Sequence, residues 1–169
     1  MGMSNGSNGQ DGRYMLAALD EARRCLGWDD VPVGAVVVRN GEFLSAAGNQ
    51  RERLGDPTAH AEILALRAAA LRIGSWRLDD CTMYVTLEPC AMCAGAMVLA
   101  RVPRLVFGAP DPKAGFAGSL GDLVRDQRLN HRMEVVSGVG SKEAGQILKA
   151  FFAARRSNGK AQAPSAAAN

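Results

Sequence analysis

The sequence predicts an α/β fold, a three-layer αβα sandwich in which helices cover both faces of a mixed central sheet. Three observations predict it. Apolar runs typical of strands alternate along the chain with segments whose apolar residues recur at helical spacing. The first two strand-like runs are joined by Asn40–Gly41, a strong signal for an antiparallel hairpin, so the sheet is expected to be mixed rather than wholly parallel. A length of 169 residues suits a single domain with one sizeable core.

The first half of the chain is predicted to contain a helix, the hairpin and a second helix. Residues 13–26 have the apolar spacing of an amphipathic helix, and residues 31–49 form the hairpin. A loop closes at Asp56–Pro57, and a helix is expected over residues 58–71. This order places a loop and then a helix after the second strand.

The second half continues the alternation of strands and helices. "CTMYVTL" reads as a buried strand, "CAMCAGAMVLA" as a helix, and "RLVFGA" as another strand. The segments expected after these are the Gly-rich loop 110–119, a short helix near 120–128, a last strand at 133–138 and an amphipathic helix over 141–156.

The two ends of the sequence lack core-forming residues. We expect residues 1–12 to be a disordered leader and residues 157–169 a disordered tail, on either side of a single domain over residues 13–156. No apolar run approaches the ~18 residues that a membrane span needs. Four cysteines are too few for a disulfide scaffold of this size, so a cytoplasmic location is expected.

Charge is distributed unevenly. The net charge is only +3, but residues 120–169 carry eight Lys and Arg against four Asp and Glu. A basic C-terminal third is compatible with a polyanionic partner. Taken alone, a solvated charged surface is the simpler interpretation.

Two short motifs indicate a metal centre. In "TAHAEI" His60 and Glu62 lie at a predicted helix start, and in "EPCAMC" Cys90 and Cys93 lie in the first turn of another helix, with Pro89 at its first position. A helix N-terminus favours thiolate over thiol, and thiolates bind zinc. If the two helix starts meet, His60, Cys90 and Cys93 supply three ligands.

Three protein ligands leave one zinc position for water, which is typical of catalytic rather than structural sites. Zinc lowers the pKa of bound water to roughly 7, and a neighbouring carboxylate, here Glu62, can move the proton to the group that is expelled. The pattern H-x-E…P-C-x-x-C with these roles is an established signature of zinc nucleobase deaminases.

The cysteines are also compatible with structural roles. A single CxxC is often a redox pair or half of a structural zinc site, and Cys81 could complete a closed site as a fourth ligand. Cys81 begins the strand that leads to Cys90, however, which would place it at the far end of the sheet. Cys25, on the first predicted helix, is most simply a packing residue.

The segments "DPTAHAEI", "YVTLEPCAMCAGAM", "LVFGAPDPKAGFAGS" and "NHRMEV" together resemble the bacterial tRNA-specific adenosine deaminases of the cytidine-deaminase-like superfamily. The resemblance runs from about residue 13 to 156. It implies a cytidine-deaminase-like fold, one zinc ion per subunit, a homodimer, and conversion of adenosine to inosine at the wobble position of a tRNA anticodon, usually in a tRNA for arginine. Free-base cytosine and guanine deaminases share the zinc motifs.

The resemblance also assigns roles to residues. Glu62 matches the proton shuttle, and His60, Cys90 and Cys93 match the zinc ligands. Asn49 matches the residue that hydrogen-bonds the flipped base, although a strand-end turn residue would look the same. The remaining residues expected to line the base pocket or to approach the anticodon are the backbone N–H of Ala61, the side chain of Val31, Asp111 and Lys113.

Two arginines and two aromatic residues near the C-terminus are further candidates. Phe151 and Phe152 precede Arg155 and Arg156 on the last predicted helix. One phenylalanine is expected in the core, and the other could stack on an unpaired base beside the arginines. Cations that complement a helix dipole account for the arginines equally well, just as a solvated turn accounts for Asp111 and Lys113.

Three functions therefore compete. The first is deamination of adenosine in the anticodon stem-loop of a tRNA. The second is a free-base or nucleoside deaminase, acting on guanine or cytosine, with the same zinc site. The third is a non-catalytic binding module that zinc stabilises.

Overall fold

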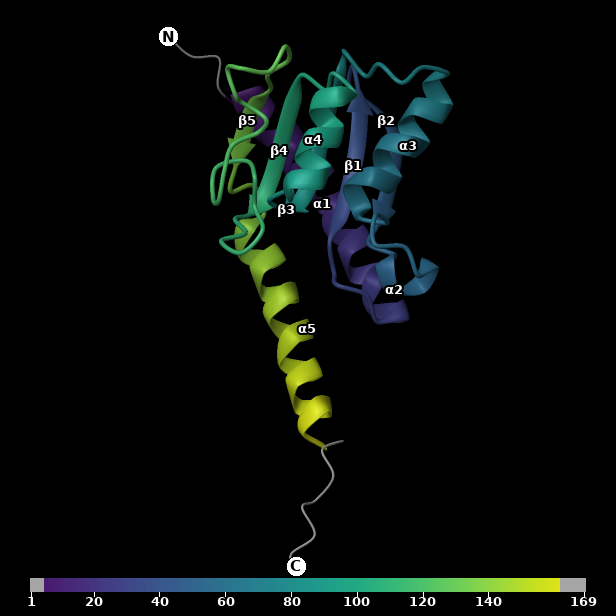
Figure 1. Ribbon diagram of the computed structural model, residues 1–169, viewed down its shortest axis with the longest axis vertical. Coiled ribbons are helices and arrows are strands. Elements are labelled where there is room, and N and C mark those ends of the chain that lie inside the picture. The colour runs from purple at the N-terminus through teal and green to yellow at the C-terminus, as the bar shows by residue number, and fades with distance from the viewer. Residues whose placement is uncertain (1–4, 162–169) are drawn as a thin grey trace, which may run out of the picture.

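The computed structural model describes residues 5–161 and shows a five-stranded mixed sheet between two layers of helices (Figure 1). The sheet has the order β2-β1-β3-β4-β5. Its strands are β1 (Gly34–Arg39), β2 (Glu42–Gly48), β3 (Cys81–Leu87), β4 (Arg104–Ala109) and β5 (Glu134–Ser137). β1 is antiparallel to both β2 and β3, whereas β3, β4 and β5 are parallel to one another. The predicted three-layer fold with a mixed sheet is confirmed.

Four helices form the outer layers. α1 (Asn5–Cys25) and α5 (Ser141–Ala161) pack on one face of the sheet, and α3 (Ala61–Ile73) and α4 (Ala91–Leu99) cover the other. Each face has its own buried cluster: Met83 and Met97 belong to the α3–α4 side, and Met15 and Tyr84 to the α1–α5 side. The C-terminal half of α5 extends beyond the sheet in Figure 1.

The predicted hairpin turn is confirmed. Asn40 and Gly41 join β1 to β2 with φ of 49° and 82°, a left-handed conformation that Asn and Gly tolerate better than other residues. Gly34 and Gly48 have a different role, because a Cβ on either would collide with the backbone of α1. Cys25 Sγ lies beside Gly48 in this close contact, so Cys25 is a packing residue, as the sequence predicted.

The prediction of a disordered leader over residues 1–12 is wrong for residues 5–12, which form the start of α1. Asp11 is buried, and its carboxylate accepts two hydrogen bonds of 2.8 Å from Arg104 and one of 2.9 Å from the hydroxyl of Tyr84. These long-range contacts hold the segment on the sheet. Residues 1–4 lie outside the described part of the chain.

Two further expectations need correction. No helix forms over residues 120–128, because Asp122 and Asp126 accept hydrogen bonds from the backbone N–H groups of Arg125 and Arg128 and so stabilise turns. The tail expected from residue 157 is helical to Ala161, and residues 162–169 are outside the described part. Between residues 5 and 161 no helix is both long and apolar enough to cross a membrane.

Replacing Asp11 with alanine should lower the free energy of unfolding by about 3 kcal/mol, because it leaves the partly buried Arg104 without its bidentate partner. Urea denaturation measures the change. Asp20→Ala is the matched control, since Asp20 lies on the same helix but is exposed and should affect stability little. Equal stabilities of the two variants would show that the Asp11 contacts do not hold α1.

Candidate metal centre and substrate pocket

The candidate site lies along one edge of the sheet. β2, β3, β4 and β5 all run in the same direction, opposite to β1, so their carboxyl ends share this edge with the amino end of β1. Asn49 follows β2, Glu88 follows β3, and the loop 110–119 follows β4. In sheets of this kind, ligands bind at the carboxyl ends of the strands.

The two motifs meet at adjacent helix starts. His60 is the N-cap of α3 and Cys90 is the N-cap of α4, with extended backbones at ψ of 150° and 173°. The helix was expected to begin at Pro89, but it begins two residues later, at Ala91. As an N-cap, Cys90 still projects from the positive end of the helix, and Cys93 follows in the first turn.

The donor set fits a tetrahedral zinc ion. His60 Nδ1 lies 3.6 Å from Cys90 Sγ and 3.6 Å from Cys93 Sγ, and all three ligand atoms lie within 4.8 Å of one another. Zinc bonds of about 2.3 Å to sulfur and 2.0–2.1 Å to nitrogen at the tetrahedral angle place nitrogen and sulfur about 3.6 Å apart. The imidazole nitrogen therefore lies at the distance from each of the two cysteine sulfurs that zinc requires.

The thiols are unequal in acidity. The neighbouring Cys93 and the imidazole of His60 lower the pKa of Cys90 to about 4, although burial opposes this shift. Contact with Cys90 and burial raise the pKa of Cys93, and contact with Cys90 raises the pKa of His60. Negative charge thus collects on Cys90, where a cation would be attracted.

Glu62 lies in the first turn of α3 and is only 4% exposed. Burial raises the pKa of its carboxyl to about 7, while the charge of His60 acts in the opposite direction. A carboxyl group with a pKa near neutrality can both accept and donate a proton at physiological pH, as a general acid–base catalyst must. It stands beside the three ligand residues without being one of them.

Asn49 is fixed by three hydrogen bonds. Its Oδ1 accepts the backbone N–H of Ala61 at 3.1 Å, its carbonyl accepts Trp28 Nε1 at 2.8 Å, and its N–H donates to Val33. Among the described residues, every fully buried side-chain nitrogen or oxygen has a hydrogen-bond partner. Asn49 Nδ2 has no such partner in this part of the chain, so this atom must be accessible from outside. The N–H of Ala61, expected to line the base pocket, is thus used to orient Asn49.

Val31 is half-buried next to a carboxylate that the sequence did not single out. Asp30 is fully buried, and its two oxygens accept the N–H groups of Val31 and Glu52 at 2.9 Å. It joins the segment before β1 to α2 (Arg51–Leu54), a short helix within the predicted loop. Asp30 directly precedes a run of apolar residues, and a carboxylate buried among them needs hydrogen-bond partners. This position was the signal by which the sequence could have revealed it.

Glu88 is the second residue that sequence reasoning missed. It is 3% exposed, and its carboxylate accepts hydrogen bonds from the backbone N–H groups of Asp111, Ala117 and Ser119 and from the hydroxyl of Ser119. Burial opposes ionisation, but these donors outweigh it and hold the pKa of Glu88 below its usual value. The Gly-rich loop is therefore attached directly to the segment that carries Cys90.

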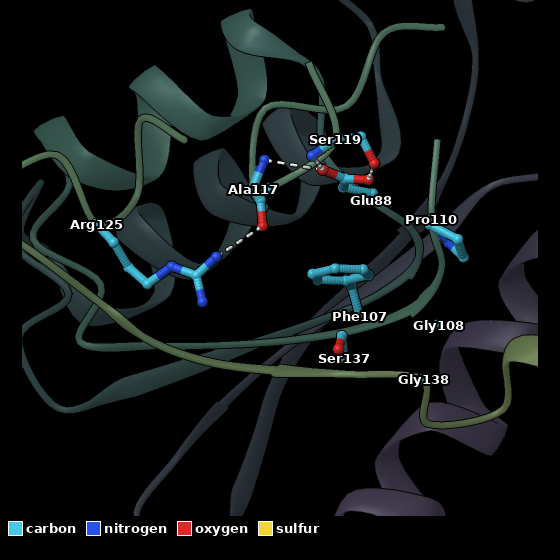
Figure 2. Close-up of a pocket in the computed structure, with 10 residues that line it drawn as sticks. Glu88, Phe107, Gly108, Pro110, Ala117, Ser119, Arg125, Ser137 and Gly138 are labelled. Carbon is cyan, nitrogen blue, oxygen red and sulfur yellow. Dashed lines mark hydrogen bonds between the residues drawn. The ribbon is translucent and has the colours of Figure 1, made fainter. Parts of the chain in front are cut away.

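Asp111 and Lys113 lie in this loop. Asp111 Oδ1 accepts the N–H groups of Lys113 and Ala114 at 3.0 and 3.2 Å, so the carboxylate caps its own turn. The side chain of Lys113 is exposed. A cavity of about 330 Å³ lies under the same loop, between Phe107, Arg125 and Ser137 (Figure 2). It is distinct from the His60–Cys90–Cys93 cluster.

The C-terminal candidates are farther along α5. Phe151 is buried and Phe152 is 43% exposed, which matches the expectation of one core and one surface phenylalanine. Arg155 lies over the ring of Phe151 and donates to Asp29 Oδ2 at 3.2 Å. Its neighbour Arg156 is exposed.

Cys81 does not join the metal cluster. It begins β3, six residues before the strand ends at Leu87, and lies at the opposite edge of the sheet. Six residues of strand span about 20 Å. Its separation argues against the closed four-ligand site.

Comparison with known proteins agrees with this geometry. Residues 10–156 match the family described as MafB19-like deaminase. The chain is 50% identical to the tRNA-specific adenosine deaminase of Bacillus subtilis strain 168 over 152 aligned residues. The aligned region covers 90% of this chain and 94% of that protein.

Two solved structures are also similar. A protein studied for A-to-I editing by tRNA:A34 deaminases at the wobble position of transfer RNA superposes with a TM-score of 0.78 at 43% identity, over 80% of this chain and 99% of that one. A guanine deaminase from Nitrosomonas europaea, with a TM-score of 0.73 at 24% identity over 84% of each chain, shares the fold. The chain therefore belongs to the MafB19-like deaminases, in the cytidine-deaminase-like fold, and within them to the bacterial tRNA-specific adenosine deaminase family.

Proposed function

We propose that this protein is a zinc-dependent hydrolase that converts adenosine to inosine at the wobble position of a tRNA anticodon, in a tRNA for arginine. The observation that carries the proposal is the cluster of His60, Cys90 and Cys93 at zinc spacing with the buried Glu62 beside it. The 50% identity to a tRNA-specific adenosine deaminase supports the choice of substrate. Such a substrate places the activity in the cytoplasm.

His60, Cys90 and Cys93 would hold one zinc ion per subunit. The chemistry that zinc supplies when bound is Lewis acidity, which makes water a nucleophile near neutral pH. The low pKa of Cys90 supports this assignment, because the thiolate is the form that binds a metal.

Glu62 would carry the protons. Water adds to C6 of the adenine, and Glu62 takes the proton that the water loses and delivers it to the ring nitrogen N1. The same carboxylate would then take the proton of the C6 hydroxyl and deliver it to the amino group, which leaves as ammonia and leaves the C6 carbonyl of inosine. The burial of Glu62 and its pKa of about 7 suit both directions of transfer.

Asn49 and Val31 would bind the flipped base. The Nδ2 amide of Asn49 can donate to an acceptor of the purine, while the N–H of Ala61 holds the side chain and Trp28 holds the backbone carbonyl. The half-buried Val31 supplies an apolar wall. Extruding a base from a single-stranded loop costs little, which suits an anticodon target.

Asn49→Ala and Asn49→Asp separate base recognition from folding. Aspartate keeps an oxygen for the N–H of Ala61 but cannot donate to the base, so both variants should lower kcat/KM about 10- to 100-fold. Single-turnover deamination of an anticodon stem-loop measures this, with zinc content as the control. If Asn49→Asp retained full activity, Asn49 would only support the fold.

Asp111, Lys113, Arg155 and Arg156 would contact the anticodon arm. All four lie on segments that leave the carboxyl edge of the sheet, on the loop 110–119 and on α5. Arg155 already pairs with Asp29, so its contribution to RNA binding competes with that exposed pair. The exposed Phe152 offers a face on which a base can stack.

A second copy of the chain would complete the enzyme as a homodimer, as the family resemblance implies. An apolar groove between α3 and α4 supports this, since it is lined by Leu66, Ala70, Trp76 and Ala96. Trp76, Leu71 and Leu99 are exposed on the same layer of the structure. Large exposed apolar side chains of this kind mark association surfaces.

Incubating the zinc-loaded protein with tRNA transcripts and sequencing them tests the proposed activity. Inosine is read as guanosine, so we expect an A-to-G change at the wobble position in a tRNA for arginine and at no other adenosine. Turnover of free guanine or cytosine without any change in tRNA would contradict the proposal and favour a small-molecule deaminase. Salt separates the two further, because binding that depends on phosphate contacts weakens steeply as salt rises.

A further inference from the structure

The buried carboxylate of Glu88 accepts four hydrogen bonds, and neither metal binding nor proton transfer by Glu62 accounts for them. Both carboxylate oxygens are satisfied, Oε1 by the N–H groups of Ala117 and Ser119 at 3.0 and 2.9 Å, and Oε2 by the N–H of Asp111 at 2.9 Å and the hydroxyl of Ser119. All of these donors belong to the loop 110–119. The carboxylate thus connects the carboxyl end of β3 to this loop, 23 to 31 residues later in the sequence.

The backbone of the loop is held at the same place. Gly115 forms an isolated antiparallel bridge with Cys90, and the N–H of Phe116 donates to the carbonyl of Pro89 at 2.8 Å. A Cβ on Gly115 would lie 2.3 Å from Cδ of Glu88, so only glycine allows the carboxylate to approach this closely.

Ala117 is fixed from two sides, as Figure 2 shows. Its N–H donates to Glu88, and its carbonyl accepts a hydrogen bond of 3.1 Å from Arg125, whose guanidinium also pairs with Asp122. The loop therefore has a defined position above the cavity at Phe107 rather than only a covalent connection to β4.

The contacts of Glu88 distinguish it from the metal ligands. Its hydrogen bonds go to the loop that carries Asp111 and Lys113, and none of them goes to His60, Cys90 or Cys93. Loss of its charge should therefore release the loop before it disturbs the metal centre.

We propose that Glu88 is a positioning residue: its buried carboxylate holds the loop 110–119 against the metal-binding segment and so sets the affinity for the RNA that Asp111 and Lys113 approach. The proposal rests on the proposed function for the identity of the ligand. The attachment of the loop by Glu88 does not depend on that function and can be measured separately.

Glu88→Gln is the informative variant. The glutamine amide has the size of the carboxylate but only one acceptor oxygen. Its NH₂ group would therefore face two of the hydrogen-bond donors of the loop, and those two hydrogen bonds would be lost. In the zinc-loaded full chain, we expect amide hydrogen exchange over residues 110–119 to accelerate about tenfold or more, with zinc content unchanged. For an anticodon stem-loop RNA, KM should rise about tenfold while kcat stays within about threefold.

Two further variants complete the experiment. Glu42→Gln makes the same chemical change at an exposed residue. Glu42 is the first residue of β2, whereas the candidate site lies beyond the last one, so this variant should alter neither amide hydrogen exchange nor KM. Ser119→Ala removes one contact to Glu88 and leaves the carboxylate three backbone donors, so it should show the same effects at about threefold. It also replaces Glu88→Gln if that variant does not fold.

Each alternative result has a distinct meaning. Unchanged exchange in the loop, or faster exchange with unchanged KM, would overturn the positioning role. Loss of zinc from Glu88→Gln would show that the residue supports the metal centre instead, and a fall in kcat alone would place it in the chemical step. If the wild-type chain deaminates no RNA, the proposed function fails, while the exchange data still decide whether Glu88 holds the loop.

Discussion

Replacing Glu62 with glutamine is expected to lower kcat for tRNA deamination by at least about 10³-fold. The amide keeps the size of the side chain but cannot take a proton from water or deliver one to the leaving group, and general acid–base catalysis contributes about 10²- to 10⁴-fold to such reactions. Because Glu62 is buried beside the ligand residues without being one of them, zinc content and RNA affinity should persist. Single-turnover assays over a range of RNA concentrations measure the rate of deamination and the RNA affinity, and metal analysis of the same sample measures the zinc content.

Glu42→Gln, at an exposed position far from the site, is the control for this prediction and should keep full activity. A Glu62→Gln enzyme that still deaminates at the wild-type rate would exclude Glu62 as the proton carrier. Loss of zinc from this variant would make it uninformative about chemistry, and Glu62→Asp, which keeps the carboxyl group, would then show whether a displaced proton carrier reduces kcat.

Serine at Cys90 or Cys93 is expected to weaken zinc binding by more than about 100-fold, because it replaces one of three protein ligands with a poor one. Activity should fall to background. The stabilisation that zinc gives the wild type, about 4 kcal/mol when free zinc is a thousand times its Kd, should be lost as well. Competition with a chromophoric chelator measures affinity, and thermal unfolding with and without zinc measures stability.

Cys81→Ser is the matched control for the two ligand variants. Cys81 is also a buried cysteine, but it lies at the other edge of the sheet, so its substitution should leave zinc affinity unchanged. If Cys81→Ser weakened zinc binding as much as Cys90→Ser, the site would be closed by four protein ligands. The protein would then be a zinc-stabilised binding module rather than an enzyme.

Features set by neighbouring residues were predicted from the sequence. The Asn40–Gly41 turn follows from local φ preferences, and the grouping of His60 with Cys90 and Cys93 follows from two helix starts that carry ligand residues. The turn lies within a few residues of its signal, and so do most of the strands and helices. The metal cluster joins residues that are 30 and 33 positions apart, so only the ligand types at each helix start were local signals.

Features set by distant partners were not predicted. The first turns of α1 have a Gly- and Asn-rich sequence with low helix propensity, and the contacts that hold Asp11 come from Tyr84 and Arg104, 73 and 93 residues away. The sequence around Glu88 likewise does not indicate that its carboxylate accepts four hydrogen bonds from a loop 23 to 31 residues later. Near residues 120–128 the side chains of Asp122 and Asp126 compete for backbone N–H groups, which a pattern of apolar residues does not reveal.

The most direct test of the central claim is the metal content and coordination of the purified, active protein, by elemental analysis and X-ray absorption spectroscopy. We expect one zinc ion per chain, bound by two sulfur atoms and one imidazole nitrogen, with a single remaining light-atom ligand from solvent. The absence of stoichiometric metal, or a third sulfur ligand in the coordination shell, would contradict an open catalytic site formed by His60, Cys90 and Cys93.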